Sequence, residues 1–216
     1  MLHVNFSHIK SGLKILCLGA HADDIEIGCG GTILKLINSY SNLEFRWVVF
    51  SSDQIRKKEA LQSANQFLSK AEKYAVDILS FEDGFFPYNG GEIKNYFEKL
   101  KLSFSPDLIF THYKTDYHQD HRLISELTWN TFRNHLILEY EVLKYDGDLG
   151  RPNFFVHLSK ENAVNKINLI TKNFISQKNK TWFDEETFKS ILRIRGVESN
   201  APEKYAEAFY VRKLIF

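Results

Sequence analysis

Residues 15–31, ILCLGAHADDIEIGCGG, place a short apolar run directly before a cluster of charge. The run ends at Gly19, and a run of this length is typical of a strand buried in a parallel sheet. Four ionisable side chains follow within six residues: His21, Asp23, Asp24 and Glu26. The stretch therefore predicts a core strand whose carboxyl end opens onto a group of ionisable side chains.

Strand-like and helix-like segments alternate on either side of this stretch. The expected strands are residues 14–19, 43–52, 75–81, 105–113 and 135–145. The expected helices start at Gly31, follow a cap at Asp53, and span 92–104 and 121–132. This alternation predicts an α/β fold, with a mostly parallel, twisted sheet, helices on both faces and right-handed crossovers.

The pattern changes after about residue 150 without any linker or repeat. Residues 154–159 are strand-like, 161–174 and 186–196 are helical, and 208–216 form an expected closing strand. We therefore expect residues 1–216 to form a single Rossmann-like domain.

Composition excludes several classes of protein. The net charge of +1 gives no sign of the basic surface that binds nucleic acids. No apolar run is long enough to span a membrane. The amino-terminal segment lacks the layout of a signal peptide. Two cysteines, Cys17 and Cys29, form no disulfide framework and fit a reducing compartment. We expect a cytoplasmic protein, and composition leaves homo-oligomer formation open.

The glycines after the first charged cluster raise the alternative of a dinucleotide-binding loop. Gly28, Gly30 and Gly31 lie nine or more residues after the strand and do not have the G-x-G-x-x-G spacing. Two carboxylates, Asp23 and Asp24, occupy the turn where a pyrophosphate needs bare backbone amides. The glycines are better explained by close packing of the following helix on the sheet.

A second cluster, THYKTDYHQDHR at residues 111–122, follows the fourth expected strand. It contains His112, Asp116, His118, Asp120 and His121. Carboxyl ends of parallel strands share one sheet edge, so we expect the two clusters to meet there. The spacing of His118 and His121 places both imidazoles on one helix face, and Asp120 is suited to hold an imidazole tautomer.

The donor types of the two clusters match a divalent metal site. Two histidines and one carboxylate leave a position open for water, which is the arrangement of catalytic zinc. Iron(II) uses the same donor types, and the residues alone leave open which aspartate is the ligand and which is the base.

These motifs resemble those of the PIG-L family of N-deacetylases, also called LmbE-like. The family's AHPDD signature with its following Glu and glycines corresponds to AHADDIEIGCGG, and its HxDH signature corresponds to HQDH. Weaker matches are SSDQIRKKEA, with Arg56 and Glu59, and RGVESNAPEKYAEAF near the carboxyl end. The resemblance covers nearly the whole chain. One departure is Ala22 in place of the usual proline, which predicts a looser turn.

The resemblance implies a role for several residues. The implied zinc ligands are His21, Asp24 and His121. Asp23 matches the general base, and His118 matches the residue that stabilises the oxyanion, with Asp120 behind it. Arg56 matches a substrate-binding arginine, and Arg195 and the turn Phe85–Tyr88 are further candidates for substrate contact.

The implied activity is zinc-dependent hydrolysis of an N-acetyl group on an N-acetylglucosamine-type or other acetamido sugar, with Asp23 activating water. The substrate is expected to be a small acetamido sugar or a glycoconjugate. The main alternative is a metal-dependent amidohydrolase with a non-sugar N-acyl substrate. An iron(II) oxygenase and a non-catalytic sugar-binding relative are further alternatives, and the presence of Asp23 argues against the second.

Overall fold

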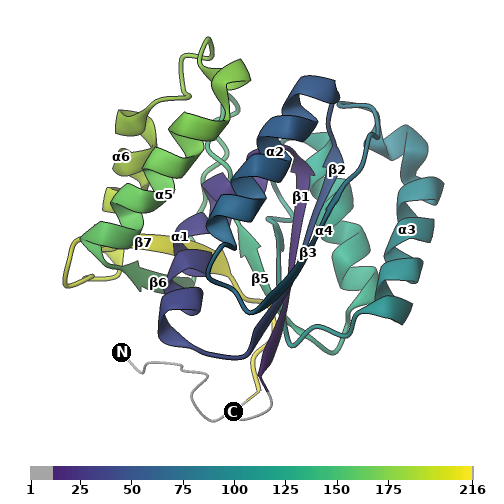
Figure 1. Cartoon of the computed structure of the whole chain (residues 1–216), viewed down its shortest axis with the longest axis horizontal. Helices are drawn as coiled ribbons and strands as arrows, with labels where there is room; N and C mark the ends of the chain where they lie inside the picture. Colours follow the sequence, from purple (N-terminus) through teal and green to yellow (C-terminus); the bar gives the residue numbers. More distant parts are fainter. Residues whose placement is uncertain (1–11, 216) are drawn as a thin grey trace.

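The computed structural model describes residues 12–215, and a seven-stranded sheet runs through this part of the chain. The strands are β1 (Leu13–His21), β2 (Leu43–Ser51), β3 (Lys73–Ile78), β4 (Leu108–His112), β5 (Leu136–Tyr140), β6 (Phe154–Leu158) and β7 (Tyr205–Tyr210). Their order is β3-β2-β1-β4-β5-β7-β6. The first five strands are parallel, and β7 pairs antiparallel with both β5 and β6 (Figure 1). The predicted mostly parallel α/β sheet is thus confirmed.

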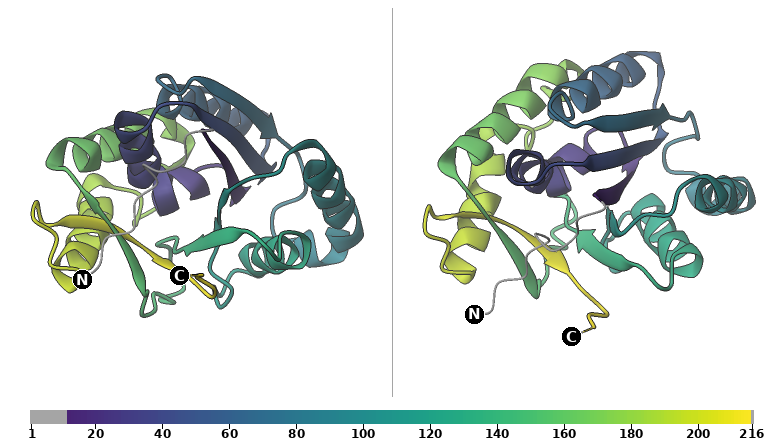
Figure 2. Two further views of the ribbon diagram at one scale, coloured as in Figure 1. Left: turned by 90° about the horizontal axis from the view of Figure 1, so that it is seen from below. Right: turned by 60° about the horizontal axis from the view of Figure 1, so that its bottom comes forward.

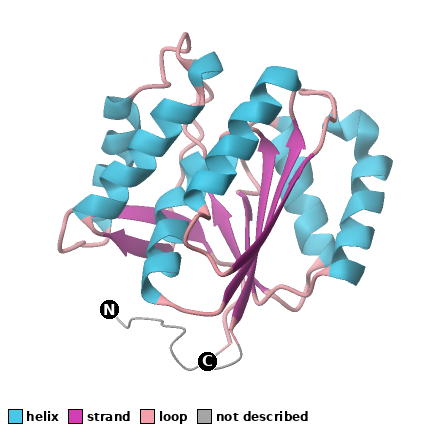
Figure 3. Cartoon of the chain, in the orientation of Figure 1, coloured by secondary structure: helices cyan, strands magenta, loops and turns pink. Residues whose placement is uncertain are grey.

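Helices cover both faces of the sheet, as predicted. They are α1 (Asp24–Ser39), α2 (Gln54–Phe67), α3 (Gly90–Ser103), α4 (Gln119–Thr131), α5 (Lys160–Asn173) and α6 (Glu185–Glu198). Figures 2 and 3 show α1, α2 and α5 on one side of the sheet and α3 and α4 on the other. Two short 3-10 helices, η1 (Phe86–Asn89) and η2 (Ile175–Gln177), lie in the connections. No helix of residues 12–215 is long and apolar enough to cross a membrane.

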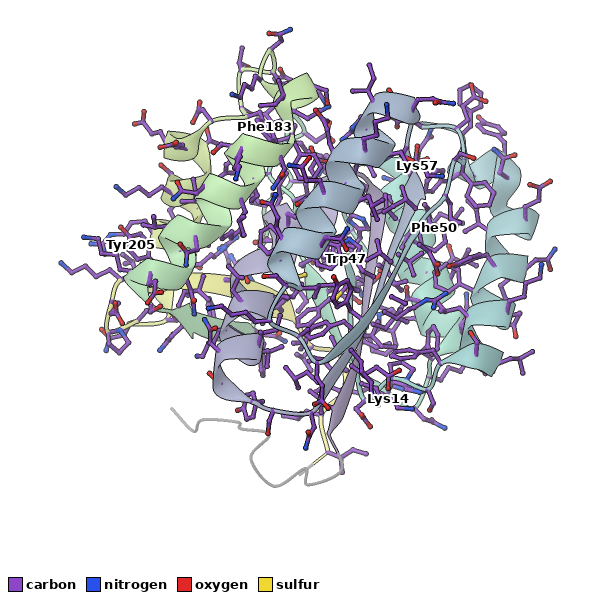
Figure 4. All side chains as sticks on the ribbon, viewed as in Figure 1. Lys14, Trp47, Phe50, Lys57, Phe183 and Tyr205 are labelled. Atoms are coloured by element: carbon purple, nitrogen blue, oxygen red, sulfur yellow. The ribbon has the colours of Figure 1, made fainter. Side chains whose placement is uncertain are left out.

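The core has one layer on each face of the sheet. Trp47 and Phe50, both on β2 and labelled in Figure 4, are fully buried in different layers. Successive residues of a strand point to opposite faces, so two residues that are three positions apart place their rings on opposite faces of the sheet. Burying large side chains on both faces supplies most of the free energy that holds the helices on the sheet.

The order in which the strands are added to the sheet changes direction between β1 and β4. From β1 it adds β2 and β3 on one side, then returns to add β4 on the other. Such a switch point leaves a crevice at the carboxyl ends of the two strands, and ligands of open α/β sheets bind there. His21 ends β1 and His112 ends β4, so both motif clusters open onto this crevice.

Helix α1 begins at Asp24, seven residues before the predicted start at Gly31. The glycines therefore lie inside the helix, where glycine is normally unfavourable. A Cβ on Gly28 would lie 2.1 Å from the ring of Tyr140, so only glycine lets the helix approach β5 this closely. The expected close packing is present, and it outweighs the poor helix propensity that made the prediction too short.

A buried ion pair crosses the middle of α1. Lys166 of α5 donates to the carbonyl of Ile27 and to Glu207 of β7, both at 2.6 Å. Glu207 in turn accepts the amides of Gly31 at 2.8 Å and Thr32 at 2.6 Å. This gives the Tyr-Ala-Glu-Ala-Phe motif near the carboxyl end a structural role, because its glutamate ties β7 and α5 to the helix that starts at the charged cluster.

Candidate metal centre

Three donor atoms converge at the switch point. Nδ1 of His21 lies 3.1 Å from Nε2 of His121, and each of these atoms lies 3.5 Å from Oδ2 of Asp24. A tetrahedral zinc site with bonds of about 2.0–2.1 Å separates its ligand atoms by about 3.3 Å. The three side chains are 2–7% exposed, so the surrounding protein shields them from most of the solvent. These residues fit a divalent cation with one face left for water or substrate.

Neighbouring carboxylates set the tautomers of the two histidines. Nδ1 of His121 lies 2.9 Å from Oδ2 of Asp116, so this nitrogen carries the proton and Nε2 keeps its lone pair. Nε2 of His21 lies 3.0 Å from Asp83 and 3.2 Å from Asp120. These carboxylates favour the tautomer in which Nε2 carries the proton and Nδ1 keeps its lone pair. Carboxylates of this kind orient metal-bound imidazoles and raise their basicity.

The pKa shifts of the three side chains indicate that a positive charge between the donor atoms would be stabilised. Burial alone would lower the pKa of His21, but hydrogen bonds to Asp120, Asp24 and Asp83 raise it well above its usual value. Burial alone would raise the pKa of Asp24, but His121 and His112 lower it well below its usual range. Burial lowers the pKa of His121 to about 4, and His112 adds to this effect. A divalent cation would supply the charge that a proton on His21 otherwise provides.

His112 lies behind the triangle. Its ring stacks on His121 with centroids 3.9 Å apart, and its Nε2 lies 3.2 Å from Oδ2 of Asp24. Asp24, His112 and His121 therefore form another possible donor set, and His118 joins His21 in two more, with His121 or with Asp83 and Asp120. However, Nε2 of His112 accepts the amide of Ala20 at 2.9 Å, which occupies its lone pair. This contact favours His21 as the ligand that completes the site.

Asp23 has a strained and partly unsatisfied environment. It occupies the N-cap position of α1 with φ of 95°, a left-handed conformation that is costly for a residue with a side chain. Its Oδ1 accepts Arg56 at 2.9 Å, and Oδ2 is buried without a hydrogen-bond partner. Burial raises its pKa to about 7, against the lowering effect of Arg56. Asp23 also lines the cavity, so its carboxylate is suited to remove a proton from water.

His118 caps α4 and lines the same cavity. Its Nδ1 accepts the amide of Asp120 at 3.3 Å, so the proton of the neutral ring lies on Nε2. Burial, followed by the charge of His21, lowers its pKa and favours this neutral form. The ring is therefore held as a neutral hydrogen-bond donor.

Asp120 has a different neighbour from the one we expected. Its carboxylate contacts His21 at 3.2 Å and accepts the amides of Gly84 at 2.7 Å and Phe86 at 3.1 Å. Only its backbone contacts His118. Asp120 thus joins the loop before η1 to a proposed metal ligand, whereas the resemblance had placed it behind His118.

The candidate substrate residues separate into two groups. Arg56 lines the cavity and also donates to the carbonyl of Ala22. Arg195 is buried in ion pairs with Glu141 at 2.7 Å and Glu198 at 2.8 Å, and does not line the cavity. Its guanidinium stabilises the carboxyl-terminal half of the fold.

The aromatic turn Phe85–Tyr88 is also outside the cavity lining. Phe86 is fully buried in the core, whereas Phe85 and Tyr88 are exposed. Packing therefore explains the middle ring of this turn, and the structure does not bring the two outer rings to the site.

The cavity beside the donor triangle measures about 230 Å³. Seven lining residues were not expected from the sequence: Asp83, Val142, Lys144, Tyr145, Asp146, Lys180 and Trp182. They come from the loops before η1, after β5 and between η2 and α6. No local motif marks them, because the folding of distant segments brings them to the switch point.

Replacing Asp116 with asparagine should weaken zinc binding by about 10- to 100-fold. The asparagine amide would no longer present a charged acceptor to Nδ1 of His121, so the basicity of the ligand nitrogen should fall. Competition with a chromogenic chelator measures this affinity. Asp148→Asn is the matched control, because Asp148 holds Lys144 at 2.6 Å without touching a proposed ligand. Equal zinc affinity in Asp116→Asn and wild type would contradict the role given to Asp116.

Known structures share this fold. An N,N'-diacetylchitobiose deacetylase from Pyrococcus horikoshii has 22% identity and a TM-score of 0.64, covering 94% of this chain and 85% of its own. The teicoplanin deacetylase Orf2, in a zinc-inhibited form, has 14% identity and a TM-score of 0.71, covering 92% and 97%. GalB, the 4-carboxy-2-hydroxymuconate hydratase from Pseudomonas putida KT2440, has 14% identity and a TM-score of 0.69, covering 94% and 98%. A hydratase and two deacetylases thus share one architecture, and fold alone does not decide the reaction.

A family model gives the more specific match. The model for GlcNAc-PI de-N-acetylases, PIG-L, matches residues 16–132, which is more than half of the chain. The match includes all three donors of the triangle, the strained Asp23, Arg56 and His118. The chain therefore belongs to the PIG-L family of de-N-acetylases, and it is a hydrolase.

Proposed function

We propose that this protein is a zinc-dependent deacetylase that removes the N-acetyl group of an N-acetylglucosamine-type sugar derivative. One observation carries the proposal. The metal-donor triangle of His21, Asp24 and His121 shares a cavity with a buried carboxylate, Asp23, whose Oδ2 has no other partner. Metal-assisted hydrolysis needs these two components side by side.

The residues divide the reaction between them. A zinc ion held by the triangle would lower the pKa of water to about 7 and polarise the acetyl carbonyl. Asp23 removes a proton from the water as the water oxygen attacks the carbonyl carbon. His118 donates through Nε2 to the carbonyl oxygen, where negative charge develops, and one such donor is typically worth about 100- to 1000-fold in rate. Asp23 then returns the proton to the nitrogen as the C–N bond breaks, and acetate and an amine leave.

Arg56 both contacts the proposed base and lines the cavity. Its guanidinium donates to Oδ1 of Asp23 at 2.9 Å, and Oδ2 keeps its lone pairs for a proton from water. It also lines the cavity, which supports the expected contact with substrate. An arginine is suited to both tasks because its fork presents several donors in a fixed plane.

The size of the cavity supports a small reacting unit. Pockets that enclose drug-sized ligands measure about 300–1000 Å³, and this one is about 230 Å³. It suits one acetamido sugar, with any further part of a larger substrate outside its mouth. We place the reaction in the cytoplasm, because both cysteines are free and buried, which fits a reducing compartment.

Acetate release from zinc-loaded protein tests the proposal. The panel contains N-acetylglucosamine, its methyl glycoside, its 1-phosphate and N,N'-diacetylchitobiose, with N-acetyl amino acids as the non-sugar arm. We expect acetate and primary amine in equal amounts from at least one sugar. Turnover of N-acetyl amino acids alone would replace the sugar proposal with a non-sugar amidohydrolase. The absence of amine from every arm would overturn deacetylation of these substrates.

A further inference from the structure

The outer wall of the cavity comes from a part of the chain that the family model does not cover. The match ends at residue 132, and Tyr145, Lys180 and Trp182 lie beyond it on two loops. The loop between η2 and α6 lies at the end of the molecule to which the arrowheads of β1 and β2 point (Figure 1). Residues from beyond the family match thus contribute to the cavity that also contains the donor triangle.

The two loops are joined to each other over the cavity. Both the amide and the hydroxyl of Thr181 donate to the hydroxyl of Tyr145 at 3.3 Å. The rings of Tyr145 and Trp182 meet edge to face, with centroids 6.4 Å apart. Trp182 is half-buried and packs on Phe188, whereas Tyr145 is 69% exposed. The pair forms a supported aromatic wall, and such surfaces suit the apolar face of a sugar ring.

Three cations line the cavity, and two of them are neutralised locally. Arg56 pairs with Asp23 at 2.9 Å, and Lys144 pairs with Asp148 at 2.6 Å. Within residues 12–215, Lys180 forms no ion pair with a carboxylate, and its ammonium lies 5.5 Å from the centroid of the Trp182 ring. Lys180 is exposed, and its ammonium lies beside the aromatic wall without a carboxylate partner in the described part of the chain.

Lys180 and the proposed base line the same cavity. Asp23 and Lys180 both contribute to its wall, and the cavity measures about 230 Å³. A single sugar unit that fills the cavity can therefore contact both side chains. An anionic group on that sugar would supply the missing counter-ion.

We propose that Lys180, Tyr145 and Trp182 form a subsite for an acetamido sugar that carries an anionic group, a phosphate or a carboxylate. The inference rests on the proposed deacetylase activity and names its substrate class. The sugar ring lies against the aromatic wall, the acetamido group faces Asp23, and the anion binds the ammonium of Lys180. A charge-assisted contact at a partly open site predicts a gain of about five- to tenfold in affinity.

Substrate pairs that differ in charge test the subsite. The neutral probe is the methyl glycoside of N-acetylglucosamine, and the anionic probes are N-acetylglucosamine 1-phosphate and N-acetylmuramic acid, which separate phosphate from carboxylate. Wild type should prefer one anionic probe. Lys180→Met should raise KM for that probe about five- to tenfold without changing kcat, and should leave the neutral probe unaffected. Lys180→Arg should retain the preference.

Lys178→Met is the matched control, because Lys178 is exposed on the same loop but does not line the cavity. An equal effect of Lys178→Met, an equal loss for neutral and anionic probes, or no preference in wild type would overturn the subsite.

Calorimetry of the same sugars with Asp23→Asn protein gives a second readout that does not need turnover. Binding of an anionic sugar that weakens on Lys180→Met would support the subsite even if no acetate were released, and that result would count against the deacetylase proposal alone. Equal affinity for charged and neutral sugars would overturn the subsite whatever the enzyme activity.

Discussion

Replacing Asp23 with asparagine should lower kcat for acetate release by about 100- to 10,000-fold, which is the range of a general base. Asparagine keeps the size of the side chain and the contact with Arg56, but it cannot accept a proton from water. The free Oδ2 of Asp23 is the atom whose basicity is lost. The measurement is single-turnover acetate release with zinc content determined on the same sample.

The matched control is Asp146→Asn. Asp146 also lines the cavity, but it lies 3.8 Å from Lys144 and its side chain is 40% exposed, so its loss should change kcat by less than about threefold. Zinc content should stay equal to that of wild type in both variants, because neither residue belongs to the donor triangle. Full activity of Asp23→Asn with zinc bound would remove Asp23 from the role of base.

Lys166→Met should lower the free energy of unfolding by about 3–5 kcal/mol. The side chain is 2% exposed, and its loss leaves the Glu207 carboxylate buried without its counter-ion. The carbonyl of Ile27 also loses a hydrogen-bond donor. Denaturant unfolding, monitored by far-ultraviolet circular dichroism, gives the difference.

Two further variants separate charge burial from a general loss of packing. Lys172→Met changes an exposed lysine on the same helix and should leave the unfolding midpoint nearly unchanged. Lys166→Met combined with Glu207→Leu removes both charges, so the double variant should be more stable than the sum of the single losses allows. Additive losses in the double variant would mean that the two charges do not stabilise each other.

Much of the fold could be predicted because each element carries its own local signal. Asp53 was expected to cap a helix, and its side chain accepts the amides of Ile55 and Arg56 at 2.8 Å. Alternation of the elements was enough to predict the sheet edge at which both charged clusters meet. The start of α1 was missed because the reasons for helix at Gly28 and Gly31 are distant in sequence: the ring of Tyr140 and the carboxylate of Glu207.

The site could be predicted only where its residues are close together in sequence. The donor triangle comes from two short motifs that follow parallel strands, and topology alone brings these motifs together. Asp83 and Lys180 enter from loops whose positions depend on side-chain packing across the whole molecule. Arg195 shows the reverse problem, because its place in a recognisable motif indicated substrate contact, whereas two nearby glutamates hold it in the fold.

Metal dependence measured on one preparation tests the central claim most directly. Protein is stripped with a chelator, analysed for metals, and assayed for acetate release before and after addition of zinc or iron(II). We predict no turnover in the stripped protein, recovery with about one metal ion per chain, and neither binding nor turnover in His121→Ala. Undiminished acetate release from metal-free protein, or full metal binding by His121→Ala, would contradict a hydrolytic centre built on His21, Asp24 and His121.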